Sequence, residues 1–247
     1  MLLPMLSKSF GDTMANVDML KREVKALVFD QYGTVVDMQG GLTDIVRVYF
    51  KSKGVDIDPS RFVTWWRRTH FENSMIDSLC DRGHTPYREI GHRAVDFTLE
   101  RAGIAHTAKE VQMLVSEIEK LKPFPEVPVA LERLGVRYRM AVLSNGDRDM
   151  LEAAKPHIGY PFDDTISVQE AGAFKPHYRT YETAAKILEL DRSSILFVAN
   201  HTFDVVGAKS FGMRTAFINR RHRPFGQTPN IPDIVVENMS ELAELIA

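Results

Sequence analysis

Cysteine is almost absent from this chain of 247 residues: Cys80 stands alone, so no disulfide can form within the chain. A chain without disulfides suits a reducing compartment, and we expect it in the cytoplasm, with Cys80 buried as a small apolar side chain. An excess of one charge is also missing, because acidic and basic residues nearly balance and the formal net charge is −2. The composition therefore does not indicate a nucleic acid or a membrane surface as a partner.

Long apolar runs are missing too, and no stretch approaches the roughly 20 residues that a membrane-spanning helix needs. The apolar run Leu2–Leu6 is too short for the core of a signal peptide and has no basic residue before it. We expect residues 1–21 to be an N-terminal extension that is irregular or forms a short packed helix without chemistry. The remaining length suits one domain with an insertion, or two small domains.

Short runs typical of β-strands alternate with helical patterns in most of the chain. This alternation is typical of βαβ units and predicts an α/β fold with a doubly wound parallel sheet and helices on both faces. The expected strands are Lys25–Phe29, Arg139–Leu143, Thr165–Val168, Ile195–Val198, Thr215–Ile218 and Ile234–Val236. The expected helices are Val127–Leu134, Asp149–Lys155, Tyr178–Leu188 and Phe203–Phe211.

The stretch 42–121 differs, because it contains no convincing strand. Amphipathic helical patterns fill it at Phe62–Leu79, Tyr87–Ala102 and Ala108–Leu121. Because this block follows the first strand and precedes the second, we expect a helical cap domain over the strand ends. The core domain would then comprise residues 22–41 and 122–247.

The segment Val28–Thr34 places an acid at the tip of the first expected strand. Asp30 ends the apolar run, and Gly33 lets the chain turn sharply at once. Ligands of open α/β sheets bind beyond the carboxyl ends of the strands, so Asp30 is a candidate nucleophile. On this segment alone, Asp30 as a helix N-cap is an equally good interpretation.

Polar residues also follow three further expected strands. Ser144 and Asn145 can donate hydrogen bonds to an anion, although a Ser-Asn-Gly turn is also common. Lys175 precedes a helix, where it either reaches a carboxylate at the sheet edge or lies in solvent. Asp204 opens another helix, where the helix dipole alone favours an acid. Each site is weak by itself, but together four polar groups fall in order at four strand ends.

The chain resembles the haloacid dehalogenase superfamily and, within it, the type II 2-haloacid dehalogenases. The resemblance covers residues 24–236 and rests on Asp-x-Tyr-Gly-Thr, Leu-Ser-Asn-Gly, Lys-Pro-x-x-x-x-Tyr and an Asp before Gly-Ala-Lys-Ser-Phe-Gly. It implies a Rossmann-like core with an inserted helical cap, no cofactor, and hydrolysis of short 2-haloalkanoic acids to 2-hydroxy acids. The partners would be a small carboxylate substrate and the halide released from it. Members of the family often form homodimers through the cap.

Two features that a phosphatase of this superfamily needs are missing. Such a phosphatase carries a second acid two residues after the nucleophile, which protonates its leaving group, and acids in the last motif that hold Mg²⁺. Here Tyr32 takes the first place, and Asn200 and His201 precede the lone Asp204 in the second. A halide leaves as a stable anion, and a carboxylate can be held without a metal. The sequence therefore predicts a metal-independent dehalogenase without metal ligands.

The resemblance implies a reaction in two steps. Asp30 attacks the carbon that bears the halogen and forms an ester with inversion, and water then cleaves this ester at its carboxyl carbon. Thr34 would bond the nucleophile, and Lys175 would keep it ionised. Arg67 of the cap, or in second place Arg68, would cradle the halide unless both lie on a solvated helix face. The catalytic set would be Asp30, Thr34, Lys175, Asp204 and His201. The substrate-binding set would be Tyr32, Gly33, Ser144, Asn145, Arg67, Tyr181, Asn200 and Phe203.

His201 is the main departure from the family pattern, in which an asparagine stands. The histidine would be a base for the hydrolytic water, a hydrogen-bond donor to the leaving halide, or only an orienting group. Other functions stay open: ring opening of a strained carboxylate of the azetidine-2-carboxylate type, a Mg²⁺-dependent phosphatase, or a non-enzymatic carboxylate binder. We expect the basic cluster 220–223 to be a solvated loop, although its place beyond a strand end keeps an anion site open.

Overall fold

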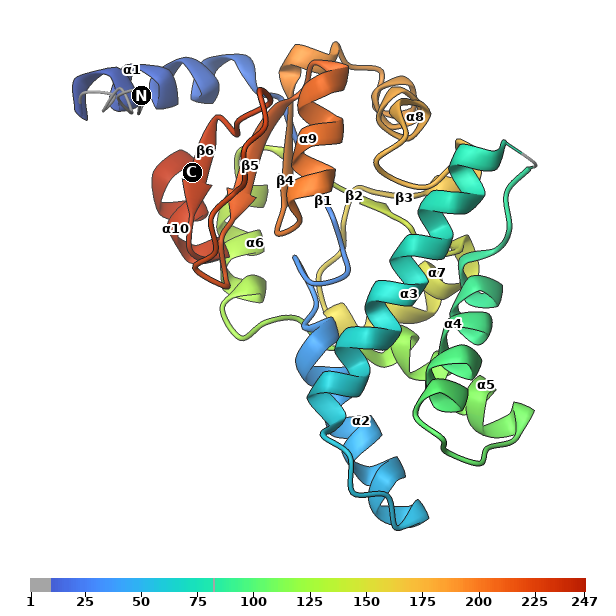
Figure 1. Cartoon of the computed structure of the whole chain (residues 1–247). Helices are drawn as coiled ribbons and strands as arrows, with labels where there is room; N and C mark the ends of the chain where they lie inside the picture. The colour runs from blue at the N-terminus through green and yellow to red at the C-terminus, as the bar shows by residue number, and fades with distance from the viewer. Residues whose placement is uncertain (1–9, 82) are drawn as a thin grey trace, which may run out of the picture.

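The computed structural model describes residues 10–81 and 83–247, which are built around a six-stranded sheet (Figure 1). All of its strands are parallel, in the order β3-β2-β1-β4-β5-β6. The strands are β1 (Ala26–Phe29), β2 (Arg139–Ser144), β3 (Asp164–Ser167), β4 (Ile195–Ala199), β5 (Arg214–Ile218) and β6 (Ile234–Val236). The predicted α/β fold with a doubly wound parallel sheet is confirmed.

The central strand β1 sets the position of the site. All four of its residues are buried, as an apolar run must be when helices cover both faces of a parallel sheet. β1 pairs with β2 on one side and β4 on the other, with Ala26 opposite both Arg139 and Ile195. The chain therefore changes direction between β1 and β4, and at such a switch point a crevice opens beyond the strand ends. Truncating the buried Phe29 to alanine would cost about 3–5 kcal/mol.

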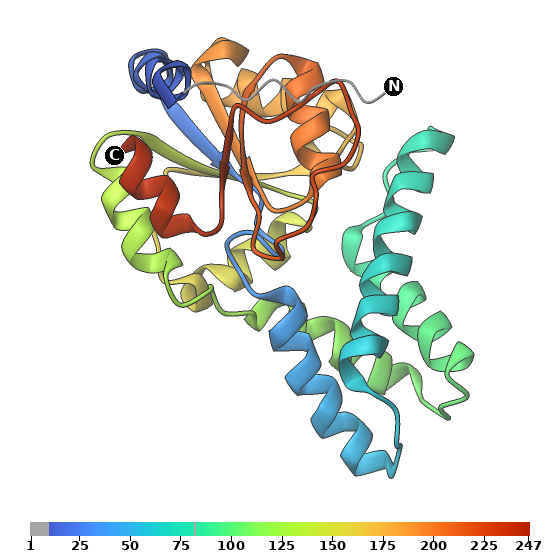
Figure 2. The same ribbon diagram turned by 60° about the vertical axis from the view of Figure 1, so that its left-hand side comes forward.

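Helices cover both faces of this sheet (Figures 1 and 2). On one face α6 (Val127–Gly135) packs against α10 (Met239–Ile246), and on the other α8 (Tyr178–Leu188) packs against α9 (Thr202–Phe211). The remaining core helix, α7 (Arg148–Ile158), contacts β3.

The described part of the N-terminal extension forms α1 (Phe10–Glu23), which buries Val17 and Leu20 and contacts α10. Residues 1–9, including the apolar run near the start, lie outside the described residues. Within the described part of the chain, no helix is both long and apolar enough to cross a membrane.

A second group of helices lies beyond the carboxyl ends of the strands (Figure 2). It comprises α2 (Met38–Lys53), α3 (Pro59–Cys80), α4 (Tyr87–Arg101) and α5 (Ala108–Ser116). α5 is shorter than the expected helix, because the chain tightens into a 3₁₀ turn at Glu117–Lys120. The exact division of the chain into core and cap domains stays a prediction.

α2 was not expected from the sequence, because the glycine pair at positions 40 and 41 lowers helix propensity. Its start is instead fixed locally: the Asp37 side chain accepts a hydrogen bond from Gly40 N at 2.8 Å and caps the helix. The interpretation of Cys80 as a buried side chain is wrong, since it is exposed where α3 ends.

A buried acid of the core fastens α4 to the sheet. The N-cap position of α4 is Pro86, whose side chain offers no hydrogen bond to the helix. Asp147, which follows β2, accepts hydrogen bonds from Tyr87 N at 2.8 Å and Arg88 N at 2.9 Å. A carboxylate from the core thus satisfies the free amides at the start of a cap helix, which fixes Tyr87 over the strand ends.

Candidate active site

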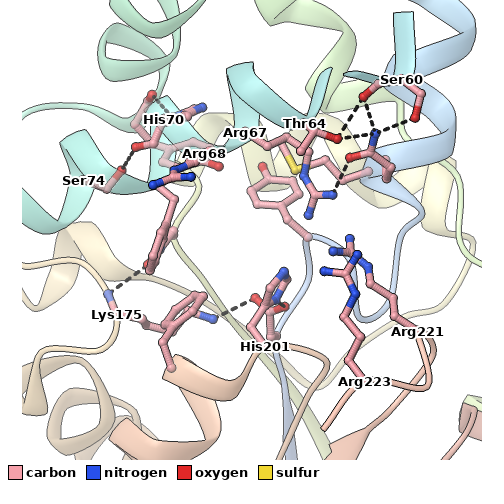
Figure 3. Close-up of a pocket in the computed structure, with 18 residues that line it drawn as sticks. Ser60, Thr64, Arg67, Arg68, His70, Ser74, Lys175, His201, Arg221 and Arg223 are labelled. Atoms are coloured by element: carbon pink, nitrogen blue, oxygen red, sulfur yellow. Dashed lines mark hydrogen bonds and ion pairs between the residues drawn. The ribbon is translucent and has the colours of Figure 1, made fainter. Parts of the chain in front are cut away.

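A cavity of about 560 Å³ lies between the strand ends and the α2–α4 helices (Figure 3). Its floor comes from the segments that follow the strands, and its upper wall comes from α2, α3 and α4. The floor residues are Asp30, Tyr32, Asn145, Lys175, His201 and Phe203, and the loop after β5 adds Arg221 and Arg223. The cap residues are Met38, Gln39, Ser60, Thr64, Arg67, Arg68, His70, Phe71, Ser74 and Tyr87.

One stripe of α3 supplies half of the residues in the cap wall. Ser60, Thr64, Arg67, Phe71 and Ser74 follow one another at steps of four, three, four and three residues, so they share one helix face. Sequence reasoning found only Arg67 of this stripe. Helical periodicity taken from Arg67 would have found the others.

Asp30 is held from three directions at the centre of the floor. Lys175 Nζ donates to Asp30 Oδ1 at 2.8 Å, and Thr34 Oγ1 donates to Asp30 Oδ2 at 2.7 Å. His201 Nδ1 lies 3.5 Å from the same Oδ2. Asp30 is therefore a fixed carboxylate open to the cavity, and the alternative interpretation as a helix N-cap does not apply.

Lys175 uses all of its protons inside the site. Besides Asp30, its Nζ donates to Asp204 Oδ2 at 2.8 Å and to Leu143 O at 2.9 Å. The lysine side chain is only 1% exposed, so its interpretation as a solvated lysine is wrong. A buried ammonium with two carboxylates and a carbonyl as partners is a permanent cation beside Asp30.

This pairing sets the charge states of the floor. Burial alone would raise the pKa of Asp30, but the ammonium of Lys175 and the hydrogen bond from His201 outweigh it and hold that pKa well below its usual range. Burial works against the charge of Lys175, yet the two carboxylates raise its pKa. Burial and the neighbouring Asp30 raise the pKa of Asp204. Asp30 is consequently ionised and ready to act as a nucleophile.

Further residues support the floor from behind. Tyr181 Oη donates to Asp204 Oδ1 at 2.7 Å, and both side chains are fully buried. Asn200 donates its backbone N–H to Thr34 Oγ1 at 2.9 Å and its side-chain amide to Gly33 O at 2.9 Å. These contacts hold the β1 and β4 ends together, so the two sides of the crevice keep one spacing.

Gly33 leaves room for the side chains of His201 and Arg67 above the floor. Its φ of +91° is in the region that favours glycine, and a Cβ there would lie 3.0 Å from His201 Cε1 and 3.4 Å from Arg67 Nη2. The imidazole and the guanidinium thus meet over the same backbone turn. Arg67 is oriented by Gln39, whose Oε1 accepts from its Nη1 at 2.9 Å.

Aromatic rings make the apolar part of the cavity. Tyr32 stacks on Tyr87 with ring centroids 5.6 Å apart, and Phe71 of α3 meets Phe203 of α9 at 4.2 Å. Burial raises the pKa of Tyr32, so its hydroxyl is neutral. Among the described residues the Tyr32 Oη has no hydrogen-bond partner, although it is buried. It is packed against Gly146, where an added Cβ would lie 2.6 Å from it.

The basic cluster 220–223 is not simply a solvated loop. Arg220 faces the protein, where its guanidinium donates to Thr34 O at 3.1 Å and lies 3.8 Å from the Phe124 ring centroid. Arg221 and Arg223 are exposed but line the cavity. The expectation of a purely solvated segment is therefore wrong, because the tie at Arg220 turns its neighbours toward the site.

The structure brings the predicted residues together at one crevice. Those that line the cavity are Asp30, Tyr32, Arg67, Asn145, Lys175, His201 and Phe203. The others lie behind or beneath this surface, namely Gly33, Thr34, Ser144, Tyr181, Asn200 and Asp204. Ser144 is fully buried, and its Oγ accepts from Gly146 N at 3.2 Å. Their roles in a reaction stay predictions.

Ligands for a metal ion are scarce in the same region. In residues 10–81 and 83–247, no group of three or more His, Cys, Asp and Glu side chains is arranged to hold one. Asn200, which precedes Asp204 in the last motif, donates its side-chain N–H to Gly33 O. That the reaction needs no metal stays a prediction.

Comparisons with known proteins agree with this geometry. The family model of haloacid dehalogenase-like hydrolases matches residues 24–212. Haloacetate dehalogenase H-2 of Moraxella sp. (strain B) is 32% identical over 92% of this chain and 99% of its own. The (S)-2-haloacid dehalogenase of Pseudomonas sp. (strain YL) is 33% identical over 90% and 94%.

Among solved structures, the chain is similar to L-2-haloacid dehalogenase from Xanthobacter autotrophicus with chloropropionic acid covalently bound. The TM-score is 0.80 at 27% identity, covering 90% of this chain and 98% of that one.

Proposed function

Since the chain belongs to the haloacid dehalogenase-like hydrolases, we propose that it hydrolyses 2-haloalkanoic acids to 2-hydroxy acids through an ester on Asp30. The observation that carries the proposal is the buried Asp30–Lys175–Asp204 cluster, which keeps a carboxylate ionised at the cavity floor. Relatives of similar length whose names state dehalogenation of haloacetate and (S)-2-haloacids support this substrate class.

In the first step an Asp30 oxygen attacks C2 of the substrate from the side opposite the halogen. The new C–O bond forms as the C–X bond breaks, the halide takes the electron pair, and C2 is inverted. Arg67 is the proposed halide cradle, since it reaches over Gly33 from the cap. Asn145 lines the cavity beside the nucleophile, and we assign it to the substrate carboxylate, while the buried Ser144 supports the turn behind it by accepting the N–H of Gly146.

In the second step a water attacks the carboxyl carbon of the ester. The 2-hydroxy acid leaves with the former Asp30 oxygen, and the water oxygen becomes part of the regenerated carboxylate. We assign the water's proton to His201, which lies 3.5 Å from Asp30 Oδ2 and opens onto the cavity. Thr34 and Lys175 would hold the ester carbonyl, and Tyr181 would fix Asp204 behind it.

The test is halide release from fluoroacetate, chloroacetate and both enantiomers of 2-chloropropionate, with chelator present. A single turnover in ¹⁸O water, followed by mass spectrometry, should place the label in the peptide that carries Asp30 and leave the product unlabelled. Label in the product of the first turnover would mean that water attacks C2 directly, which would overturn the ester mechanism.

Replacing His201 with alanine, which removes the imidazole without installing the asparagine of the family pattern, separates the two steps. If the histidine takes the water's proton, the variant should accumulate the ester, detected as a mass increase on the peptide with Asp30, while the first turnover still releases halide. A variant that releases no halide at all would instead assign His201 to the halide, and equal rates would assign it neither role.

A ring-opening reaction is the second candidate, because His201 stands where it can give a proton to a leaving amine. Azetidine-2-carboxylate in the same assay, with amino-acid analysis of the product, tests it. The cytoplasmic location and the homodimer through the cap are proposals from the sequence alone.

A further inference from the structure

One end of the cavity is more basic than a monocarboxylate substrate requires. Arg67 comes to it from α3, and Arg221 and Arg223 come from the loop after β5. Their guanidinium groups point toward one another across this end of the cavity (Figure 3). Like charges gathered in this way repel, so the arrangement is favourable only when an anion lies between them.

These cations are not neutralised by the protein. Among the described residues, Arg68 and Arg220 have carboxylate partners in Glu72 and Glu126, whereas Arg67, Arg221 and Arg223 form no ion pair. Asp30 is the one acid that lines the cavity, and its charge is already matched by Lys175.

The acid nearest to these arginines on the cap side is also engaged. Asp37 accepts the N–H of Gly40 and caps α2, although its charge still acts on Arg67 and Arg221. A surplus of positive charge remains.

Burial and the repulsion between these arginines lower the pKa values of Arg67 and Arg221. Burial, and next the positive charge of Arg221, lower the pKa of Arg67 to about 10. Burial, and next the charge of Arg223, lower the pKa of Arg221. An anion bound between these groups would offset their repulsion, and this relief would add to its binding energy.

The loop is held in place for such a role. Arg220 donates to Thr34 O, next to the nucleophile's turn, and Asn219 Oδ1 accepts Arg223 N at 3.0 Å. The base of the loop is thereby tied to the end of β1, and the backbone that carries Arg221 and Arg223 is held beside the cavity. The guanidinium group also matches a planar carboxylate with two parallel hydrogen bonds.

We propose that Arg221 and Arg223 form a second carboxylate subsite and that the preferred substrates are 2-halo dicarboxylic acids, of which 2-chlorosuccinate is the simplest. One carboxylate would lie at Asn145, the halogen at Arg67, and the distal carboxylate at the two loop arginines. The proposal rests on the proposed dehalogenation, and it adds the class of acid that the cavity selects.

The experiment measures kcat/KM for halide release from 2-chlorosuccinate and from 2-chloropropionate, using both enantiomers of each. The enzymes are the wild type, the double variant Arg221→Gln/Arg223→Gln, and the control Arg133→Gln, an exposed arginine on α6. We expect the wild type to prefer 2-chlorosuccinate. In the double variant the ratio of the two kcat/KM values should fall about 30-fold, because charge-assisted bidentate contacts are lost. In the control the ratio should not change.

Equal losses for both substrates in the double variant would overturn the proposal and assign the arginines to general attraction of anions or to the halide. A wild type that prefers 2-chloropropionate would overturn it as well. The double variant Arg221→Lys/Arg223→Lys keeps the charge without the planar fork, and we expect it to recover only part of the ratio.

A binding measurement keeps this proposal separate from the proposed reaction. Calorimetric titration of the wild type with succinate and with propionate needs no halogen. If no haloacid releases halide but succinate binds more tightly than propionate, and the double variant loses this difference, the reaction is wrong and the subsite stands. If succinate and propionate bind equally, the subsite is wrong whatever the reaction is.

Discussion

The floor of the cavity and its rim, the basic end formed by Arg67, Arg221 and Arg223, differ in how their charges are paired. On the floor, Lys175 is buried between Asp30 and Asp204, and each charge has a partner within 2.8 Å. On the rim, Arg67 and Arg221 face one another with no carboxylate bound to either. A paired, buried cluster fixes one reaction geometry, whereas unpaired cations at an opening select what enters. The comparison teaches that, under the proposed function, different parts of this molecule would carry the reaction and the choice of substrate.

Removing the nucleophile should cause the largest loss of activity. In Asp30→Asn the amide cannot attack C2, so we expect kcat for halide release to fall by about 10⁴-fold or more. Asp204 still pairs with Lys175 in this variant, so the fold should survive, and circular dichroism checks this. Activity within about tenfold of the wild type would contradict the assignment of Asp30.

Removing the cation of the floor should cost both activity and stability. In Lys175→Gln two buried carboxylates lose their partner, and we expect kcat to fall about 10²- to 10³-fold and the protein to lose about 3 kcal/mol. The control is Lys209→Gln. Lys209 lies in the last turn of α9, away from the cavity, and the substitution breaks its ion pair with Asp233. A variant as stable as this control would show that the floor does not depend on the pairing.

The Lys175→Gln variant should also change how kcat/KM depends on pH. In the wild type the lowered pKa of Asp30 keeps it ionised across the acid range, so this group stabilises the fold above its ordinary pKa and the effect is lost only as pH falls through the lowered value. Without Lys175, burial dominates and raises that pKa. The acid limb of kcat/KM should therefore move to higher pH in Lys175→Gln, and an unmoved limb would exclude Asp30 as its source.

The rim should respond in the opposite way. In Arg67→Gln we expect kcat/KM for halide release to fall about 30-fold, since the halide loses its cationic partner. The melting temperature should stay the same or rise, because repulsion from Arg221 is relieved. Arg61→Gln, an exposed arginine on the same helix that does not line the cavity, is the matched control. A destabilised Arg67→Gln protein would show that the rim is structural and would remove the contrast with the floor.

The smallest effect is expected from chelation. Prolonged treatment with EDTA should change the rate of halide release by less than about 1.5-fold, because a carboxylate and a halide are held by N–H groups and cations already present. Re-addition of Mg²⁺ is the control. A rate of halide release that collapses with EDTA and returns with Mg²⁺ would contradict the metal-independent mechanism and would show that the reaction needs a bound metal ion.

The sequence predicts the floor better than the rim, for a physical reason. Asp30 and Asp204 follow buried apolar strands or open helices, so their positions depend on local patterns that a single sequence carries. Parallel strands then bring their ends to one edge, which is why these residues could be expected at one site from the sequence, while their roles stay predictions.

The rim depends on how distant segments pack. Gln39 lies on α2, whose two glycines lower its helix propensity, so the sequence did not predict this helix. Tyr87 is held at the cavity by the hydrogen bonds between the start of α4 and Asp147. Arg221 lies in a loop without periodicity, so only the tie of Arg220 to the nucleophile's turn shows which way it faces. None of these contacts has a local sequence signature.

The link between Asp147 and the start of α4 has a consequence for how this protein can change. The carboxylate bonds backbone amides of the cap, and every residue except proline supplies such an amide, so the link does not depend on which side chains the cap carries. The cap can therefore exchange its cavity-facing residues while its docking to the core is retained. The hydrogen bonds from the cap to Asp147 need a particular residue only on the core side. The cap is therefore the part of the protein in which we would engineer new specificities.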